Sequence, residues 1–379
     1  MIYLDNAATT PMPIEVVEAM KPYFTRSFAN PASLYDFACD VKRDVEKARK
    51  ILANVIGAKA SEIYFTSGGT ESDNWAIKGI AENYNHKGKH IITTSIEHHA
   101  VLHTCQWLEK QGYEVTYLPV DEYGMVNPND VEKTIRTDTI LISVMYANNE
   151  IGTIQPITEI GEIAKKHGII FHTDAVQAYA HFPINVKRDN IDLLSVSGHK
   201  FGGPKGTGFL YVRNGIQIDS FIHGGSQEDG IRAGTTNVPG IIGMAKAVEI
   251  AMRNLAKNMT YVEGLRDYLI KKVLSEIPNV KLNGHPTRRL GGNASLCFDG
   301  IEGEALLILL NMDGICVSAG SACNAGSKET SHVLRAIGLD DEYASSAIRI
   351  TLSSDNTMEE IDFVVERLKE NVAKLRSMG

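Results

Sequence analysis

The sequence predicts an α/β fold with two parts, a large domain with a mostly parallel seven-stranded sheet between helices and a smaller α+β C-terminal domain. Two observations support this prediction. Up to about residue 255, short β-rich runs alternate with helical stretches, which is typical of a parallel sheet covered on both faces. Beyond that point the alternation stops. We therefore expect a large domain over residues 16–255 and a small domain made of residues 1–15 and 256–379.

The elements follow in order from periodicity. Residues 36–57 carry apolar side chains at helical spacing, with Asp36 as a plausible N-cap. Seven strands are then expected at residues 63–66, 90–94, 115–118, 140–144, 169–173, 193–197 and 209–212. Helices lie between them, for example at 100–110 and 157–167. The small domain should hold a long helix at 259–274, strands around Leu296, Val317 and Ile350, and a final helix from Thr357.

Composition excludes several classes of protein. A hydrophobic content of 43% and a charged content of 22% argue against disorder. The formal charge of -8, without clustered Lys and Arg, argues against direct nucleic-acid binding. No apolar run is long enough to cross a membrane, and the start of the chain lacks the pattern of a signal peptide. We expect a cytoplasmic protein with no membrane contact.

Five cysteines occur, at positions 39, 105, 297, 316 and 323. Their odd number and the lack of a C-x-x-C pair argue against a disulfide framework or a standard zinc site and favour free thiols. Cys323 lies in a run of small residues, about 318–330, which we expect to be a mobile exposed loop. Because such a cysteine has no packing role, its reactivity is the better reason for its presence. The other four are expected in the core.

Polar residues follow several predicted strands, and ligands gather at the carboxyl ends of strands in open α/β sheets. Asp174 and Gln177 follow one strand, and Lys200 follows the next among glycines. Asp174 could pair with a protonated ring nitrogen, although an acid at a strand end is equally typical of a helix N-cap. Lys200 could be a nucleophilic amine, or it could simply be solvated. Asn148-Asn-Glu150 adds another polar strand end, or an ordinary turn.

Two glycine-containing segments could bind an anion. Ser67-Gly-Gly-Thr-Glu71 joins a strand to a helix, where backbone N–H groups suit a phosphate. The alternative is a tight turn. Residues 224–235 combine glycines with Arg232 and a hydroxyl, and they could equally form a flexible loop.

Histidines allow two interpretations. His98 follows a strand and could stack on a planar ring or move protons. Alternatively, His99 and His103 are spaced i, i+4 on a helix and could share a metal ion. We nevertheless expect no metal site at these two histidines.

Taken together, these motifs resemble those of cysteine desulfurases of the NifS/IscS type, which are fold-type I pyridoxal-phosphate enzymes. The resemblance covers essentially the whole chain. The motifs are Tyr3-Leu-Asp-Asn-Ala-Ala-Thr-Thr-Pro11, Thr66-Ser-Gly-Gly-Thr-Glu71, Glu97-His98, Asn148-Asn-Glu-Ile-Gly152, Asp174 with Gln177, Ser197-Gly-His-Lys200, Arg232-Ala-Gly-Thr235 and Ser321-Ala-Cys323.

The resemblance implies pyridoxal 5'-phosphate as the cofactor. Lys200 would bind it covalently, Asp174 would pair with the ring nitrogen, and Gln177 would bond the ring hydroxyl. His98 would stack on the ring. The phosphate would be held by Gly69, Thr70, Ser197 and His199, with Thr235 of the partner subunit completing the site in a homodimer. Asn149 would contact cofactor and substrate, and Arg349 would bind the substrate carboxylate.

The implied reaction removes sulfur from L-cysteine. Lys200 would take the Cα proton, and the Cys323 thiolate would attack the substrate sulfur, leaving a persulfide on the enzyme and releasing alanine. The acceptor would be an iron-sulfur scaffold or a tRNA-thiolation enzyme. Selenocysteine lyase, a non-catalytic sulfur-trafficking protein and an aminotransferase are the alternatives.

Two positions depart from the family pattern. Many relatives have Asn-Pro-Ser-Ser-x-His where this chain has Asn30-Pro-Ala-Ser-Leu-Tyr35, so the role of that histidine is in doubt here. Ala319 stands where a serine is frequent, which is too small a change to alter the loop.

Overall fold

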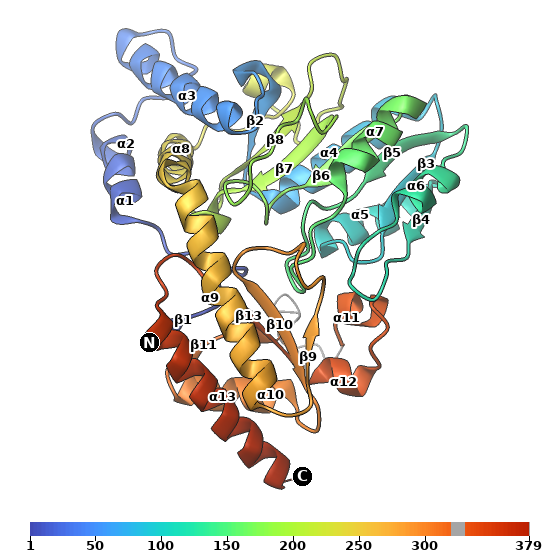
Figure 1. The fold of residues 1–379 in the computed structure, drawn as a ribbon. Helices are drawn as coiled ribbons and strands as arrows, with labels where there is room; N and C mark the ends of the chain where they lie inside the picture. The colour runs from blue at the N-terminus through green and yellow to red at the C-terminus, as the bar shows by residue number, and fades with distance from the viewer. Residues whose placement is uncertain (320–329, 379) are drawn as a thin grey trace.

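A mixed seven-stranded sheet forms the centre of the computed structural model, which describes residues 1–319 and 330–378 (Figure 1). The strand order is β2-β8-β7-β6-β5-β3-β4. Its strands are β2 (Ile63–Thr66), β3 (His90–Thr94), β4 (Glu114–Leu118), β5 (Thr139–Ser143), β6 (Ile170–Asp174), β7 (Leu193–Ser197) and β8 (Gly208–Val212). All neighbours are parallel except β8, which runs antiparallel to both β2 and β7. The predicted mostly parallel sheet is confirmed.

Helices cover both faces of this sheet, because nearly every strand residue is buried and needs apolar cover on each side. One core cluster joins one face to helices α1, α3, α6, α7 and α8, and another joins the opposite face to α4 and α5. These helices are α1 (Ile14–Met20), α3 (Asp36–Val55), α4 (Gly69–Tyr84), α5 (His99–Glu109), α6 (Pro128–Thr134), α7 (Ile157–His167) and α8 (Val238–Arg253). The short α2 (Pro22–Thr25) lies between α1 and α3.

The C-terminal part contains a four-stranded antiparallel sheet in the order β12-β13-β10-β9. The strands are β9 (Val280–Asn283), β10 (Asn293–Phe298), β12 (Ser318–Ala319) and β13 (Ala347–Thr351). The helices are α9 (Leu255–Glu276), α10 (Gly303–Met312), α11 (His332–Ala336), α12 (Asp341–Ser345) and α13 (Met358–Met378). This part has a core cluster of its own, which includes Leu4.

The N-terminus packs with this C-terminal part. Strand β1 (Ile2–Tyr3) pairs in parallel with β11 (Ile315–Cys316), so the first residues lie beside a strand more than 300 positions away in the chain (Figure 1). Residues 5–10 then run from the small sheet toward the large one. The chain therefore crosses between the two sheets at its very start, as well as at α9.

Three expectations from the sequence need correction. Tyr35, not Asp36, is the N-cap of α3, and Asp36 is the first helical residue, where its charge suits the helix dipole. Cys39 is exposed rather than in the core, because the buried stripe of α3 contains Ala38 and Val41 and leaves position 39 facing solvent. Cys316 is only partly buried, whereas Cys105 and Cys297 are buried as predicted. Among the described helices, none is long and apolar enough to span a membrane.

Candidate active site

The carboxyl ends of β6 and β7 bring Asp174 and Lys200 to one edge of the sheet. Asp174 is the last residue of β6, is 6% exposed, and accepts a hydrogen bond from the Val176 N–H at 2.8 Å. It therefore stabilises the turn that follows and does not cap a helix, because no helix begins between β6 and β7. Burial raises the pKa of Asp174 to about 6, against the lowering effect of the Lys200 charge. A buried carboxylate of this kind is stabilised by a cationic partner.

Lys200 lies in the short turn after β7, and the N-terminal segment crosses in front of it. Its Nζ donates to the carbonyl oxygens of Ala7 at 2.6 Å and Ala8 at 2.9 Å. The Gln177 side chain donates to the same Ala7 oxygen at 3.0 Å. Lys200 and Gln177 are therefore brought together, as predicted. The part played by residues 7–8 was not predicted, since nothing in their types points to chemistry.

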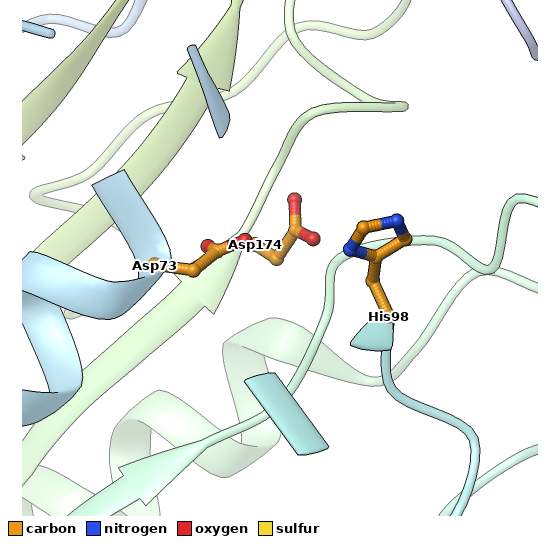
Figure 2. Close-up of side chains that lie close together, drawn as sticks. All are labelled: Asp73, His98 and Asp174. Atoms are coloured by element: carbon orange, nitrogen blue, oxygen red, sulfur yellow. The ribbon is translucent and has the colours of Figure 1, made fainter. Parts of the chain in front are cut away.

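His98 is the N-cap of α5 and lies beside Asp174 (Figure 2). Its Nδ1 accepts a hydrogen bond from the Ala100 N–H at 3.1 Å. Burial lowers the pKa of His98 to about 4, and the positive charge of Lys200 contributes to that shift. The ring is therefore neutral at physiological pH. With Nδ1 acting as an acceptor, the ring proton lies on Nε2.

The first turn of α4 offers backbone N–H donors that suit an anion. The backbone N–H groups of Gly69 and Thr70 have no acceptor within the helix, and the helix dipole places partial positive charge there. A Cβ atom on Gly69 would lie 2.6 Å from Cγ2 of Val176 and 3.5 Å from Cβ of Ser197. Glycine at this position thus lets Val176 pack against the start of the helix, with Ser197 beside it. His199 continues the same loop, with its Nδ1 3.1 Å from the Thr9 hydroxyl.

Residues 224–235 contribute less than the sequence suggests. Arg232 forms a two-fold ion pair with Glu71, with N–O distances of 2.8 and 3.0 Å, so it stabilises the start of α4 rather than standing ready for an anion. Thr235 is exposed and makes no hydrogen bond to the cluster in the described parts of the chain.

Arg349 approaches the site from the small sheet. It lies on β13, is 2% exposed, and donates to Asp5 at 2.9 Å and to the carbonyl oxygen of Asn149 at 3.1 Å. Its Nε has no hydrogen-bond partner among the described residues. A buried guanidinium with an N–H donor that makes no hydrogen bond within the protein is suited to bind a carboxylate. Asp5 was not singled out beforehand, although it lies inside the opening motif.

Cys323 lies outside the described residues, but both described ends of its segment are close to this site. On one side, Ser318 pairs with Arg349 across β12 and β13. On the other, the Ser331 hydroxyl donates a hydrogen bond to the Glu150 carboxylate, next to Asn149. The segment that carries Cys323 therefore starts and ends beside the residues that could bind a substrate.

The metal interpretation of His99 and His103 gains no support. Their rings stack, with centroids 4.9 Å apart, and the His332 ring lies 4.8 Å from that of His99. Within residues 1–319 and 330–378, however, the group that brings three possible ligand atoms within 4.8 Å of one another is Asp73, His98 and Asp174. Asp73, on α4, was missed because an acid in a helix gives no signal of its tertiary neighbours.

A cavity of about 320 Å³ lies between the two sheets. Gln177 and Lys200 line it from the large sheet, and Asn293, Thr351 and Ser353 line it from the small one. A small molecule therefore has space beside the lysine.

Comparison with known proteins agrees with this geometry. The family model described as aminotransferase class-V matches residues 2–364. A cysteine desulfurase IscS from Methanosarcina thermophila is 59% identical over 378 residues, which cover 100% of this chain and 93% of the relative. A cysteine desulfurase IscS from Clostridium botulinum is 53% identical over 380 residues, covering 100% and 96%.

Solved structures give the same result. A structure described as a NifS-like protein superposes with a TM-score of 0.93 at 40% identity, covering 99% of this chain and 100% of the other. Another, described as SspA in complex with cysteine, has a TM-score of 0.83 at 40% identity, covering 93% and 99%. Fold and sequence together show that this chain belongs to the class-V aminotransferase family and, within it, to the cysteine desulfurases.

Proposed function

We propose that this protein removes sulfur from L-cysteine, releases L-alanine and holds the sulfur as a persulfide on Cys323. The observation that carries the proposal is the meeting of Lys200, Asp174 and His98 at one sheet edge, with Arg349 reaching the same region from the other sheet. A lysine amine, a buried carboxylate and a carboxylate-binding arginine are the groups that amino-acid chemistry on an aromatic aldehyde cofactor requires.

The donor set fits pyridoxal 5'-phosphate, the cofactor of this family. Asp174 offers a buried carboxylate to a protonated ring nitrogen, and Gln177 offers an amide beside Lys200. The first turn of α4, with Ser197 and His199, offers donors to the phosphate. When bound, the cofactor supplies an electron sink for bonds at the Cα of the amino acid.

The protein groups divide the remaining work. Arg349 would fix the substrate carboxylate by a pair of N–H donors, oriented by its contacts with Asp5 and the Asn149 carbonyl. Lys200 would hold the cofactor, and its amine would remove the Cα proton of the substrate. His98, neutral because of its lowered pKa, would stack on the ring without adding a positive charge near the ring nitrogen.

Cys323 would complete the reaction as a nucleophile. Its thiolate forms a bond to the substrate sulfur as the bond between that sulfur and the substrate Cβ breaks. The electron pair of the broken bond stays with the carbon skeleton, which takes up one proton at Cβ, balanced by the proton of the substrate thiol, and regains the proton at Cα. It leaves as alanine, and the sulfur stays on the enzyme as a persulfide. The described ends of the Cys323 segment, at Ser318 and Ser331, flank the substrate-binding residues and support this assignment.

The proposal includes the setting of the reaction. Residues 16–255 would form the large domain, and residues 1–15 with 256–379 the small domain. Thr235 of the partner subunit would reach the phosphate, so that a homodimer completes each site. The persulfide would pass to a sulfur-acceptor protein such as an iron-sulfur scaffold or a tRNA-thiolation enzyme. The free thiols of the described cysteines suit a cytoplasmic location.

Absorption spectra and product assays test this function together. The purified protein, supplied with pyridoxal phosphate, should show a visible absorption band and should convert cysteine to alanine. Lys200→Ala should lose both the band and the activity. Cys323→Ser should keep the band and form no persulfide. Undiminished sulfur release by Cys323→Ser would refute the assigned nucleophile, and activity confined to selenocysteine would establish the lyase alternative.

A further inference from the structure

A second carboxyl group, Asp73, lies behind the carboxylate that faces the cofactor. Asp73 is on α4 and is 1% exposed. One of its oxygen atoms lies within 4.8 Å of an Asp174 oxygen and of a His98 ring nitrogen. Figure 2 shows the Asp174 carboxylate between the Asp73 side chain and the His98 ring. Two buried carboxyl groups this close repel each other when both are ionised.

Among residues 1–319 and 330–378, the ion-pair neighbour of Asp73 is a histidine that carries no charge. His172, below it on β6, has its Nε2 3.7 Å from Oδ1 of Asp73, but burial lowers the pKa of His172 to about 3, so the ring is neutral. The ring nitrogens of His172 lie 2.8 Å from the Ser143 hydroxyl and 3.0 Å from that of Ser195. The remaining charged neighbour, Glu97, is a carboxyl group and also raises the pKa of Asp73.

Asp174 differs from Asp73 in having partners for a negative charge. It accepts the Val176 N–H, and the positive charge of Lys200 lowers its pKa. Lys200 is not among the charges that act on Asp73. Asp73 accepts a hydrogen bond from Ser195, but its Oδ1 has no partner within hydrogen-bond distance in the described chain. Burial without a partner at this oxygen favours the neutral carboxyl group, because an ionised oxygen there would lose its hydration with nothing in its place.

We infer that Asp73 is a neutral carboxylic acid that positions Asp174, so that the pair carries a single negative charge and that charge lies on Asp174. This inference rests on the proposed function in one respect. A pair with a single negative charge would balance the single positive charge of a protonated ring nitrogen. Asp73 touches neither substrate nor cofactor and acts through Asp174.

Infrared spectroscopy of the holoenzyme tests the protonation state directly. At pH 7.5, the wild type should show a carboxylic-acid C=O stretch that shifts when all aspartates are labelled with ¹³C at Cγ, and that is lost in Asp73→Asn. Burial also raises the pKa of Glu97 to about 8, so a protonated glutamate can give a similar band. The label distinguishes the C=O stretch of an aspartate from that of a glutamate. Asp189→Asn is the matched control, because Asp189 is fully buried but paired with Arg188. Absence of a label-sensitive band would overturn the inference.

The positioning role has a separate readout. Asn keeps the neutral charge, the shape and an oxygen that can accept from Ser195, whereas Ala keeps only the neutral charge. The dissociation constant of pyridoxal phosphate, measured by fluorescence titration, should therefore stay within about threefold in Asp73→Asn and rise roughly tenfold in Asp73→Ala, because Ala leaves a cavity behind the Asp174 carboxylate. Equal weakening in both variants would contradict the role.

A third measurement separates this inference from the proposed function. The visible band can be titrated with pH, and the midpoint of that titration reports the protonation of the chromophore. Removing a buried negative charge beside Lys200 and the cofactor would lower the midpoint by more than ~1 pH unit, because that charge stabilises the protonated form of the chromophore. If Asp73 is already neutral, Asp73→Asn should leave the midpoint unchanged. A wild type without a visible band would refute the proposed function, whereas a normal band with a lowered midpoint in Asp73→Asn would refute only the role of Asp73.

Discussion

At the scale of single residues, the site depends on charges that burial has made costly. Asp174, Glu97 and Glu150 are all buried carboxyl groups with raised pKa values, and Arg349 is a buried guanidinium. Each is retained because a nearby partner or an expected ligand offsets the loss of hydration. Arg349 shows this most clearly, since Asp5 and a carbonyl oxygen hold it in place.

Arg349→Lys should weaken substrate binding more than turnover. Lysine cannot present two N–H donors in one plane to a carboxylate. We expect KM for cysteine to rise roughly 10- to 100-fold, or about 1.4–2.8 kcal/mol, with a smaller change in kcat. Steady-state kinetics measure this. Arg43→Lys, at an exposed position of α3, is the control and should change neither constant. An unchanged KM in Arg349→Lys would remove Arg349 from substrate binding.

Residue types and order identified the groups at the ends of β6 and β7 because a strand end predicts where a side chain points. Lys200, Gln177 and Asp174 were found in this way. Asp5 and Asp73 were not, because each meets a residue that is distant in the chain, Arg349 for Asp5 and Asp174 for Asp73. Pairing with such distant residues leaves no trace in local spacing.

At the scale of elements, the start of α4 is the feature that decides phosphate binding. The helix follows β2 after a short turn, and its first N–H groups point out of the helix end. Val176 packs this close only because position 69 lacks a Cβ atom, and Ser197, at the end of β7, lies next to it. The turn is therefore a tight connection, and we propose it as the anion site.

Gly69→Ala should reduce cofactor affinity, because its methyl group would overlap Val176. We expect the dissociation constant of pyridoxal phosphate to rise roughly tenfold, and the double variant Gly69→Ala with Val176→Ala to recover most of that loss. Gly264→Ala, on an exposed face of α9 with open space around it, is the control. It should leave affinity unchanged and raise the free energy of unfolding by about 0.5–1 kcal/mol. Affinity in Gly69→Ala equal to that of the wild type would rule out a close approach at this turn.

The strands and most helices of the large sheet were predictable, because their apolar runs and periodicity are strong and local. The direction of β8 was not, since the loop from β7 gives no sign that the chain reverses. Strand β9 was also missed. Its side chains are only partly buried, so its pattern lacks the apolar run that marks the central strands.

At the scale of the whole molecule, two sheets with separate cores are joined where the substrate would bind. Arg349 and Ser331 come from the C-terminal part, and Asn149 and Glu150 from the loop after β5. Resemblance across the whole chain predicted that Arg349 and Asn149 serve one site, whereas local sequence patterns could not, because the two residues are 200 positions apart.

Buried acids should make the folded protein less stable as pH rises. Burial raises the pKa of Glu97 from 4.5 to about 8, so the folded state holds a proton that the unfolded state has lost. The stability from this group is complete below pH 4.5 and is lost as pH rises through about 8. Between these pH values the free energy of unfolding should fall less steeply in Glu97→Gln, whose side chain stays neutral. The difference in slope should be up to ~1.4 kcal/mol per pH unit.

Urea denaturation at several pH values measures this dependence. Glu366→Gln, on the exposed side of α13, is the control and should leave the decline as it is in the wild type. A Glu97→Gln variant whose stability falls with pH as steeply as that of the wild type would show that Glu97 is ionised in the folded state.

Mass spectrometry of the enzyme after a single exposure to L-cysteine, without reductant, tests the central claim most directly. The peptide that contains Cys323 should gain the mass of one sulfur atom in the wild type and none in Lys200→Ala. Cys39, which is exposed but lies on α3, provides an internal comparison and should stay unmodified. An extra sulfur on Cys39, or on Cys323 in the absence of the Lys200 amine, would contradict the account.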